Sequence, residues 1–258
     1  MKKGQKLWSR EELILAINLF CKLPFGKLHR NNPEVVQLAQ LIARSPSSVA
    51  YKLVNFASLD PSLQARGIKG AINASRLDKE IWDEFYANWD DLPYESEKLK
   101  AAKYNIPIDH LILEEEAAFS FELGKTREQT IKARVNQQFF RQSILAAYDF
   151  TCCITGLKQP ELLIASHIRP WGLDEKNRLN PRNGLALNSL HDKAFEEGLM
   201  TITPDYQILM SSILLKQLKQ LAIEAFFRPY HRKEIILPKR FLPDPEFLAY
   251  HNQERFKP

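Results

Sequence analysis

Leu162-Leu163-Ile164-Ala165-Ser166-His167-Ile168 is a short, mainly apolar run, and it predicts a β-strand that carries His167 near its end. A turn, Cys153-Ile154-Thr155-Gly156, precedes this strand, and a loop rich in Asn, Pro, Gly and charged residues follows it over residues 169–182. Asn183-Gly184-Leu185-Ala186-Leu187 predicts a short return strand, and residues 189–198 predict a helix that stops at its glycine. The order of elements is therefore strand, loop, strand and helix.

This order, with these residues at its corners, resembles the ββα-metal finger of HNH nucleases over roughly residues 150–212. The pieces that carry the resemblance are Cys153-Ile154-Thr155-Gly156, Ala165-Ser166-His167-Ile168, Asn183-Gly184-Leu185 and His191-Asp192-Lys193-Ala194-Phe195. The resemblance implies a metal-dependent DNA endonuclease that hydrolyses phosphodiester bonds, in restriction or defence against foreign or modified DNA. Two alternatives stay open: a DNA-binding regulator with a catalytically weakened, HNH-derived domain, and an RNA-cleaving toxin.

Phosphodiester hydrolysis requires a base that deprotonates water, a cation that stabilises the developing charge, and a scaffold that holds both. His167 is the expected base, because a neutral imidazole with a pKa of about 6.5 accepts a proton at pH 7. The resemblance places the general base at this strand end. It also implies that Asn183 ties the loop by side-chain hydrogen bonds and so orients the histidine, although Asn-Gly is a common turn dipeptide as well. His191 completes the expected catalytic residues.

The residue before the base departs from the family's pattern. HNH proteins usually have Asp or His there, whereas this sequence has Ser166, a weak ligand at best. The resemblance implies a final metal ligand nine residues after the Asn, which is Asp192, and His191 precedes it by one position. Asp192 and Glu196 are one helical turn apart and offer oxygen ligands for Mg²⁺ or Mn²⁺, the favoured ions. His191 would favour Zn²⁺ or Ni²⁺. Metal ligands are therefore expected among Asp192, His191 and Glu196.

The N-terminal part of the chain contains repeated helix-start signals. Ser9 and Glu12 form a capping box, Asn32-Pro33 and Ser45-Pro46 each place a cap residue before a proline, and Ser75 precedes a further helix. Apolar residues follow each start at helical spacing. These patterns predict a helical domain over residues 1–92. With the nuclease-like domain expected over residues 126–258, they predict an α+β protein of two domains.

The helices that follow Asn32 and Ser45 are separated by a very short turn, and the pair resembles a helix-turn-helix or Myb-like unit. In such a unit the second helix lies in the DNA major groove. The candidate DNA-binding residues are then Ser47, Ser48, Tyr51 and Lys52, and Arg169 in the loop of the nuclease-like segment is a further candidate. The alternative is a three-helix bundle that does not contact DNA.

Charge is unevenly distributed along the 258 residues. Residues 1–70 carry 11 Lys and Arg against 4 Asp and Glu, residues 71–122 carry 5 against 13, and the remainder carries 20 against 14. Basic ends suit a polyanionic partner, because Lys and Arg displace the counterions condensed on phosphate. Double-stranded DNA is therefore the expected partner, and the acidic residues 93–125 are interpreted as a linker.

Three cysteines, two of them adjacent, exclude a disulfide framework and a four-thiolate zinc site. No run of about 18 apolar residues is present, so a membrane-inserted protein is not expected. The basic N-terminus is followed by a stretch interrupted by Arg10, Glu11 and Glu12, which does not fit a secretory signal. These features favour a cytoplasmic protein, and a homodimer is left open.

Overall fold

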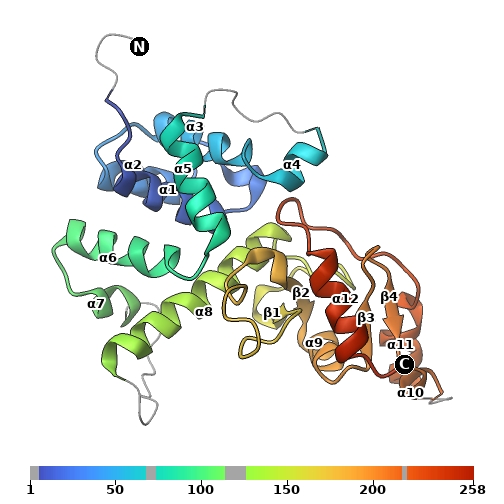
Figure 1. The fold of residues 1–258 in the computed structure, drawn as a ribbon. Coiled ribbons are helices and arrows are strands. Elements are labelled where there is room, and N and C mark those ends of the chain that lie inside the picture. Colours follow the sequence, from blue (N-terminus) through green and yellow to red (C-terminus); the bar gives the residue numbers. More distant parts are fainter. Residues whose placement is uncertain (1–5, 68–73, 114–125, 217–219) are drawn as a thin grey trace. The chain divides into compact units, whose positions relative to one another are not determined.

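The computed structural model describes residues 6–67, 74–113, 126–216 and 220–258, and the chain forms two compact units, residues 1–142 and 143–258 (Figure 1). The boundary between the units falls within one helix, α8. The first unit is helical throughout its described part. Its helices are α1 (Arg10–Lys22), α2 (Pro33–Leu41), α3 (Pro46–Ala57), α4 (Pro61–Ala65), α5 (Arg76–Ala87), α6 (Leu92–Tyr104), α7 (Ile108–Leu113) and α8 (Arg127–Ala147).

The helix starts in the first unit follow the predicted caps. Ser9 caps α1 and forms a capping box with Glu12, and Asn32 and Ser45 cap α2 and α3, each with proline at the first helical turn. Such caps satisfy backbone N–H groups that have no partner inside the helix, and each contributes about 0.5–2 kcal/mol. Ser75 caps α5 in the same way. Side-chain capping therefore fixes where these four helices begin.

An aromatic cluster holds α1, α3 and α5 together, and Figure 1 shows these helices packed side by side. The rings of Phe20, Phe56 and Trp82 lie 5.9–6.3 Å apart between centroids, and all three side chains are buried. Aromatic pairs at such distances contribute about 0.5–1.5 kcal/mol beyond their hydrophobic burial. This cluster is the centre of the first unit's core.

The segment interpreted as an acidic linker, residues 93–125, is largely helical where the structure describes it. Helix α6 contacts α1: the Asn18 amide donates to Ser96 Oγ at 2.8 Å, and Lys22 pairs with Glu97 at 3.2 Å. Acidic residues of this segment thus form ion pairs within the unit. The low apolar content of the segment gave no indication of this packing. Residues 114–125 lie outside the described residues. The unit consequently extends beyond the expected boundary at residue 92.

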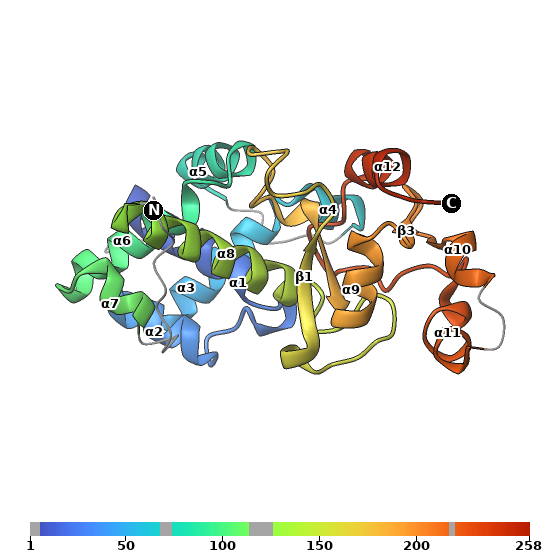
Figure 2. The ribbon, with the colours of Figure 1, turned by 90° about the horizontal axis from the view of Figure 1, so that it is seen from below.

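The second unit combines two small sheets with helices, so the α+β class is confirmed. Strands β1 (Leu163–His167) and β2 (Gly184–Asn188) pair antiparallel, with His167 opposite Gly184. Helix α9 (Ser189–Glu196) follows β2 directly and contacts both strands; Figure 2 shows it beside β1. The remaining strands and helices of this unit are β3 (Met200–Ile202), β4 (Ile208–Met210), α10 (Ser212–Leu215), α11 (Leu221–Phe226) and α12 (Pro245–Glu254).

Gly198 ends α9 in a conformation that requires glycine. Its φ is +70°, and a Cβ at this position would lie 2.1 Å from the Arg255 carbonyl oxygen. This close approach lets the Lys257 N–H donate to the Gly198 carbonyl at 2.9 Å. The C-terminal segment after α12 is thereby joined to the end of α9, and the predicted glycine stop has a packing reason as well as a conformational one.

His251 of α12 lies in the core of the second unit. Its ring stacks on Phe195 with centroids 3.7 Å apart, and it hydrogen-bonds Thr201 Oγ1 at 2.8 Å. Burial lowers the pKa of His251 to about 4, although the hydrogen bond to the Phe195 carbonyl opposes this shift. The neutral imidazole is therefore a structural element that joins α9, β3 and α12.

Acidification is expected to destabilise the second unit through this histidine. Because the pKa is depressed in the folded protein, stability is fully present above about pH 6.5 and is lost as the pH falls towards about 4, by about 3 kcal/mol. Calorimetric melting of the wild type and His251→Gln between pH 7 and 4 measures this, because the variant should lose less stability over that range. The exposed His29→Gln serves as control and should follow the wild type. Parallel pH dependence in wild type and His251→Gln would contradict the assignment.

Candidate functional site

The end of β1 places Ser166 and His167 beside the first turns of α9. Ser166 is buried, whereas His167 is partly exposed. The loop of residues 168–183 leaves the sheet after His167 and returns at Gly184, the residue paired with it. A short sheet, a loop and a helix thus bring one hydroxyl close to Asp192 of α9, and a histidine directly follows that hydroxyl in the chain.

The hydrogen bonding of His167 determines which ring nitrogen carries its proton. Nε2 lies 2.8 Å from the Arg178 carbonyl oxygen, and a carbonyl accepts only, so Nε2 holds the hydrogen and Nδ1 keeps its lone pair. The Trp171 ring meets the imidazole edge-on at 5.5 Å. Burial lowers the pKa of His167, with the Arg178 hydrogen bond opposing it. The imidazole is therefore neutral at pH 7, in the tautomer that can accept a proton at Nδ1.

Asn183 ties the loop to the end of β1 by three side-chain hydrogen bonds. Its Oδ1 accepts from the Arg169 N–H at 2.8 Å, and its Nδ2 donates to the carbonyls of Arg169 and Asn177, both at 3.1 Å. The residue is fully buried. These bonds fix the backbone on both sides of the loop, including the approach to Arg178, whose carbonyl holds His167. Asn183 thus has the loop-tying contacts that the sequence led us to expect.

Asn183→Ala is expected to lower the rate of any reaction that uses His167 by about 10- to 100-fold, because loss of a group that orients a catalytic side chain typically has this size of effect. The loss should appear in kcat rather than in the substrate concentration at half-maximal rate. Asn252→Ala is a matched control: Asn252 Nδ2 also makes three hydrogen bonds in this unit, two of them to β3 and one within α12. Equal kcat losses in both variants at a temperature where both are folded would reduce Asn183 to a purely structural role.

Asp192 is the α9 residue that faces the end of β1. The Ser166 hydroxyl lies close enough to its carboxylate to favour the ionised form. Burial raises the pKa of Asp192 and the negative charge of Glu196 adds to this, while the Ser166 hydroxyl opposes it. Two carboxylates that repel each other beside a hydroxyl group are an arrangement that a cation would stabilise.

A divalent metal fits this donor set by its chemistry. Ser166, Asp192 and Glu196 offer oxygen atoms, which suit a hard ion that keeps several waters. Across the described ranges, no group of three or more His, Cys, Asp or Glu side chains is arranged to hold a metal. The protein would therefore supply two carboxylates and a hydroxyl. Glu196 is exposed and lies 3.3 Å from Lys193 Nζ, so it would exchange this ion pair for the metal.

His191 does not face this site, which corrects its expected roles in catalysis and metal binding. Its side chain is buried, with Nε2 2.8 Å from the Phe226 carbonyl and Nδ1 3.0 Å from Asn188 Oδ1. The rings of Phe227 and Tyr230 pack around it. One residue along a helix rotates the side chain by about 100°, so when Asp192 faces β1 its neighbour faces a different packing surface. His191 holds α9 to the end of α11 and to the segment that follows it.

The predicted DNA-binding residues of α3 divide into exposed and buried ones. Ser47 and Tyr51 are exposed and Ser48 is half-buried. Lys52 is buried and pairs with both carboxylate oxygens of Asp78 at 2.7 Å, so the prediction that it contacts DNA is wrong. A buried ion pair of this kind is costly to break, and it fixes α3 against α5. The surface of α3 that remains for DNA is the one with Ser47, Ser48 and Tyr51.

Arg169 is also held by contacts within its own unit. Its guanidinium pairs with Asp174 at 3.1 Å and lies over the rings of Phe247 and Tyr250, at 5.1 and 4.9 Å from their centroids. Only about a third of its side chain is exposed, at 32%. The structure therefore corrects its expected role as a DNA contact to one of fixing the loop against α12.

Two contributors to the site were missed by sequence reasoning. The Arg178 carbonyl orients His167. Every residue has a backbone carbonyl, so the sequence cannot indicate which one makes this contact. Asp174 anchors Arg169, and it stands in a loop whose polar composition hides the pair. Trp171 contacts the imidazole and also lies under the Arg178 guanidinium at 5.3 Å. The bulky tryptophan was the one visible signal that this loop packs on the histidine.

Comparison with known proteins agrees with this geometry. Residues 152–203 match the model of a family described as HNH endonuclease, and this segment contains β1, β2, α9 and β3. Residues 152–203 are therefore similar to an HNH endonuclease domain, as the resemblance indicated. No curated protein matches the sequence. In the described part of the chain, no helix is both long enough and apolar enough to cross a lipid bilayer.

Proposed function

We propose that this protein is a divalent-metal-dependent DNA endonuclease, with the catalytic centre at the end of β1 and a DNA-binding surface on α3. The observation that carries the proposal is the His167 tautomer. Its Nε2 is held by the Arg178 carbonyl, which leaves Nδ1 as the basic nitrogen, and His167 directly follows Ser166 at the end of β1. A base and a set of metal-binding oxygens thus belong to the same short segment.

In the proposed reaction, His167 Nδ1 removes a proton from a water molecule that attacks phosphorus. The new P–O bond forms as the bond to the leaving sugar oxygen breaks. The imidazolium keeps its Nε2 hydrogen bond to Arg178, which becomes stronger as the ring gains charge. Asn183 holds the loop that carries this carbonyl. A bound Mg²⁺ or Mn²⁺, held by Asp192, Glu196 and Ser166, would supply stabilisation of the negative charge on the phosphate oxygens.

The experiment is cleavage of supercoiled plasmid by purified protein with Mg²⁺ or Mn²⁺ and with excess chelator. Nicked or linear product that requires the metal supports the endonuclease. Binding without cleavage under all metal conditions would favour the weakened regulator, and preferential cleavage of RNA would favour the toxin. The Ser166–Asp192 contact supports an active site, because the hydroxyl that replaces the usual ligand still faces the carboxylate.

A role in restriction or defence is proposed because the chain combines a nuclease centre with a surface that can bind DNA. A nuclease centre in one unit and an exposed helix surface in the other give a protein that can select DNA before cutting it. The net excess of Lys and Arg in residues 1–70 supports binding through phosphate contacts. The base contacts would come from Ser47, Ser48 and Tyr51, whose side chains can donate and accept hydrogen bonds.

Binding of duplex DNA is expected to weaken steeply with salt. Ser47→Glu is expected to weaken binding at least about tenfold, because the added negative charge would repel the DNA phosphates. Binding is measured by fluorescence anisotropy with full-length His167→Ala at several salt concentrations. Gln129→Glu is the matched control, since it adds the same charge in the first turn of α8. If Ser47→Glu and Gln129→Glu bind equally well, α3 does not face the DNA.

A further inference from the structure

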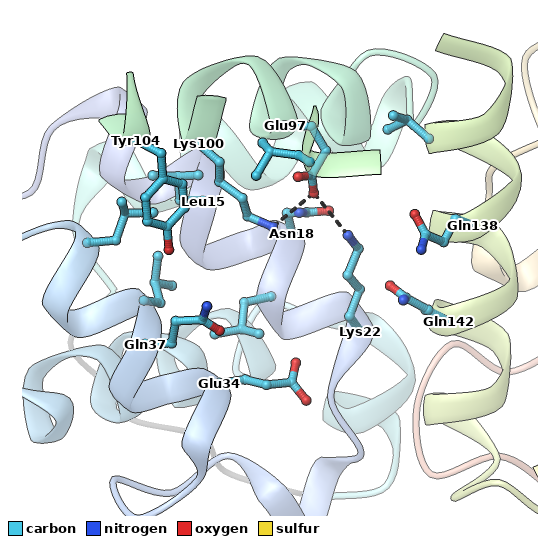
Figure 3. A pocket seen from close by; sticks show the side chains of 15 residues that line it. Leu15, Asn18, Lys22, Glu34, Gln37, Glu97, Lys100, Tyr104, Gln138 and Gln142 are labelled. Atoms are coloured by element: carbon cyan, nitrogen blue, oxygen red, sulfur yellow. Dashed lines mark hydrogen bonds and ion pairs between the residues drawn. The ribbon is translucent and has the colours of Figure 1, made fainter. Parts of the chain in front are cut away.

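A cavity of about 450 Å³ lies in the first unit between α1, α2, α6 and α8 (Figure 3). Every residue that lines it belongs to this unit, so it is separate from the proposed nuclease centre. Its volume is within the range of about 300–1,000 Å³ typical of small-molecule sites. Leucine side chains such as Leu15 and Leu38 form its apolar part. The cavity can therefore enclose a small ligand with an apolar face.

One buried polar atom in its wall lacks a partner. Asn18 is 1% exposed, its Nδ2 donates to Ser96 Oγ at 2.8 Å, and among the described residues nothing hydrogen-bonds its Oδ1. Figure 3 shows the Asn18 amide inside the cavity, among Lys22, Lys100 and Glu97. An unmade hydrogen bond to a buried amide is unfavourable, so a bound N–H donor would stabilise this wall.

The charged residues of the cavity balance one another. Glu97 accepts from Lys22 at 3.2 Å and from Lys100 at 2.9 Å, and these side chains are largely buried. Although burial raises the pKa of Glu97, the two lysines lower it below its ordinary value. With Glu34 also on the wall, two cationic groups face two anionic ones. The cavity is thus suited to a neutral ligand rather than to a phosphate or a cation.

Carboxamides and one aromatic ring complete the lining. Gln37 comes from α2, and Gln138 and Gln142 come from α8 (Figure 3). Each amide can donate and accept, so together they can read a ligand edge on which donors and acceptors alternate. Tyr104 offers a ring face at the end of α6. A neutral, flat heterocycle with hydrogen-bonding edges matches both the polar and the apolar parts of this wall.

We propose that this cavity binds a nucleobase, with Asn18 Oδ1 accepting from a base N–H and Gln37, Gln138 and Gln142 contacting the other edge. The choice of a base among neutral heterocycles rests on the proposed function, because a DNA-acting chain meets bases. The base can come from a free nucleoside or from a nucleotide turned out of a duplex, whose exposed edges offer the same chemistry.

The test uses full-length His167→Ala protein and each of the four deoxynucleosides in turn. At least one nucleoside should raise the melting temperature by roughly 2–4 °C or more, because a ligand that binds the folded state stabilises it by mass action. Asn18→Leu and Gln142→Leu should each abolish the rise. Asn55→Leu is the matched control, because Asn55 is also buried with an unpartnered Oδ1 but does not line the cavity.

Two outcomes would overturn the proposal: no nucleoside stabilises the protein, or the stabilisation is unchanged in Asn18→Leu and Gln142→Leu. Duplex DNA with a single 2-aminopurine then identifies the source. A rise in its fluorescence on binding, absent in Asn18→Leu, assigns the base to DNA, and nucleoside binding without that rise assigns it to a free nucleoside. Nucleoside binding is independent of plasmid cleavage, so failure of this proposal is distinguishable from failure of the nuclease.

Discussion

His167→Ala is expected to lower the rate of plasmid cleavage by about 100- to 10,000-fold, the usual effect of removing a general base. The structure gives the reason. The Arg178 carbonyl holds Nε2–H, so Nδ1 is the basic nitrogen, and among the described residues no other histidine belongs to a strand that contacts α9. Single-turnover cleavage with saturating protein isolates the chemical step.

The control for this variant is His110→Ala, an exposed histidine of the first unit, which should cleave at the wild-type rate. Circular dichroism and DNA binding should be nearly unchanged in His167→Ala, because the imidazole is partly exposed and its hydrogen bond to the Arg178 carbonyl lies within the loop. A His167→Ala protein that cleaves as fast as the wild type would remove this residue from the mechanism.

The parts of this fold that could be predicted are those specified by local sequence. The strand that ends at His167, the return strand after Asn183 and the helix that stops at Gly198 all form within one or two residues of their expected bounds. Caps such as Ser45 act within one helical turn, so they can be recognised without knowledge of tertiary contacts. The α+β class followed from these signals.

The parts that could not be predicted depend on partners that are distant in the sequence. Lys52 pairs with Asp78, 26 residues later, and nothing in the local pattern distinguishes a buried lysine from a groove-facing one. His191 is held by the Phe226 carbonyl, 35 residues later, and this contact decides that Asp192 rather than His191 faces the sheet. Helix α6 was interpreted as a linker because it has many charged residues. One partner of Glu97 is Lys22 on α1, which is distant in the sequence.

Asp192→Asn is expected to lower cleavage at least about 100-fold and to raise the concentration of Mg²⁺ or Mn²⁺ needed for half-maximal rate. The substitution keeps the size of the side chain and its polarity towards Ser166, but removes the half-buried charge that would face the cation. A metal that stabilises phosphate charge contributes several kcal/mol, and each 1.4 kcal/mol is about tenfold in rate. Metal titrations of cleavage measure both effects, and calorimetry with Mn²⁺ alone measures the affinity without catalysis.

Related variants rank the oxygen donors of the same centre. Glu196→Gln should raise the metal demand less than Asp192→Asn, because Glu196 is exposed and already paired with Lys193. Ser166→Asp should lower the demand by adding a charged oxygen next to Asp192. Glu197→Gln is the matched control, since Glu197 is an exposed carboxylate on the same helix end that also pairs with Lys193. If Asp192→Asn and Glu197→Gln cleave alike at every metal concentration, the cation is bound elsewhere, and the Ser166–Asp192 contact serves packing alone.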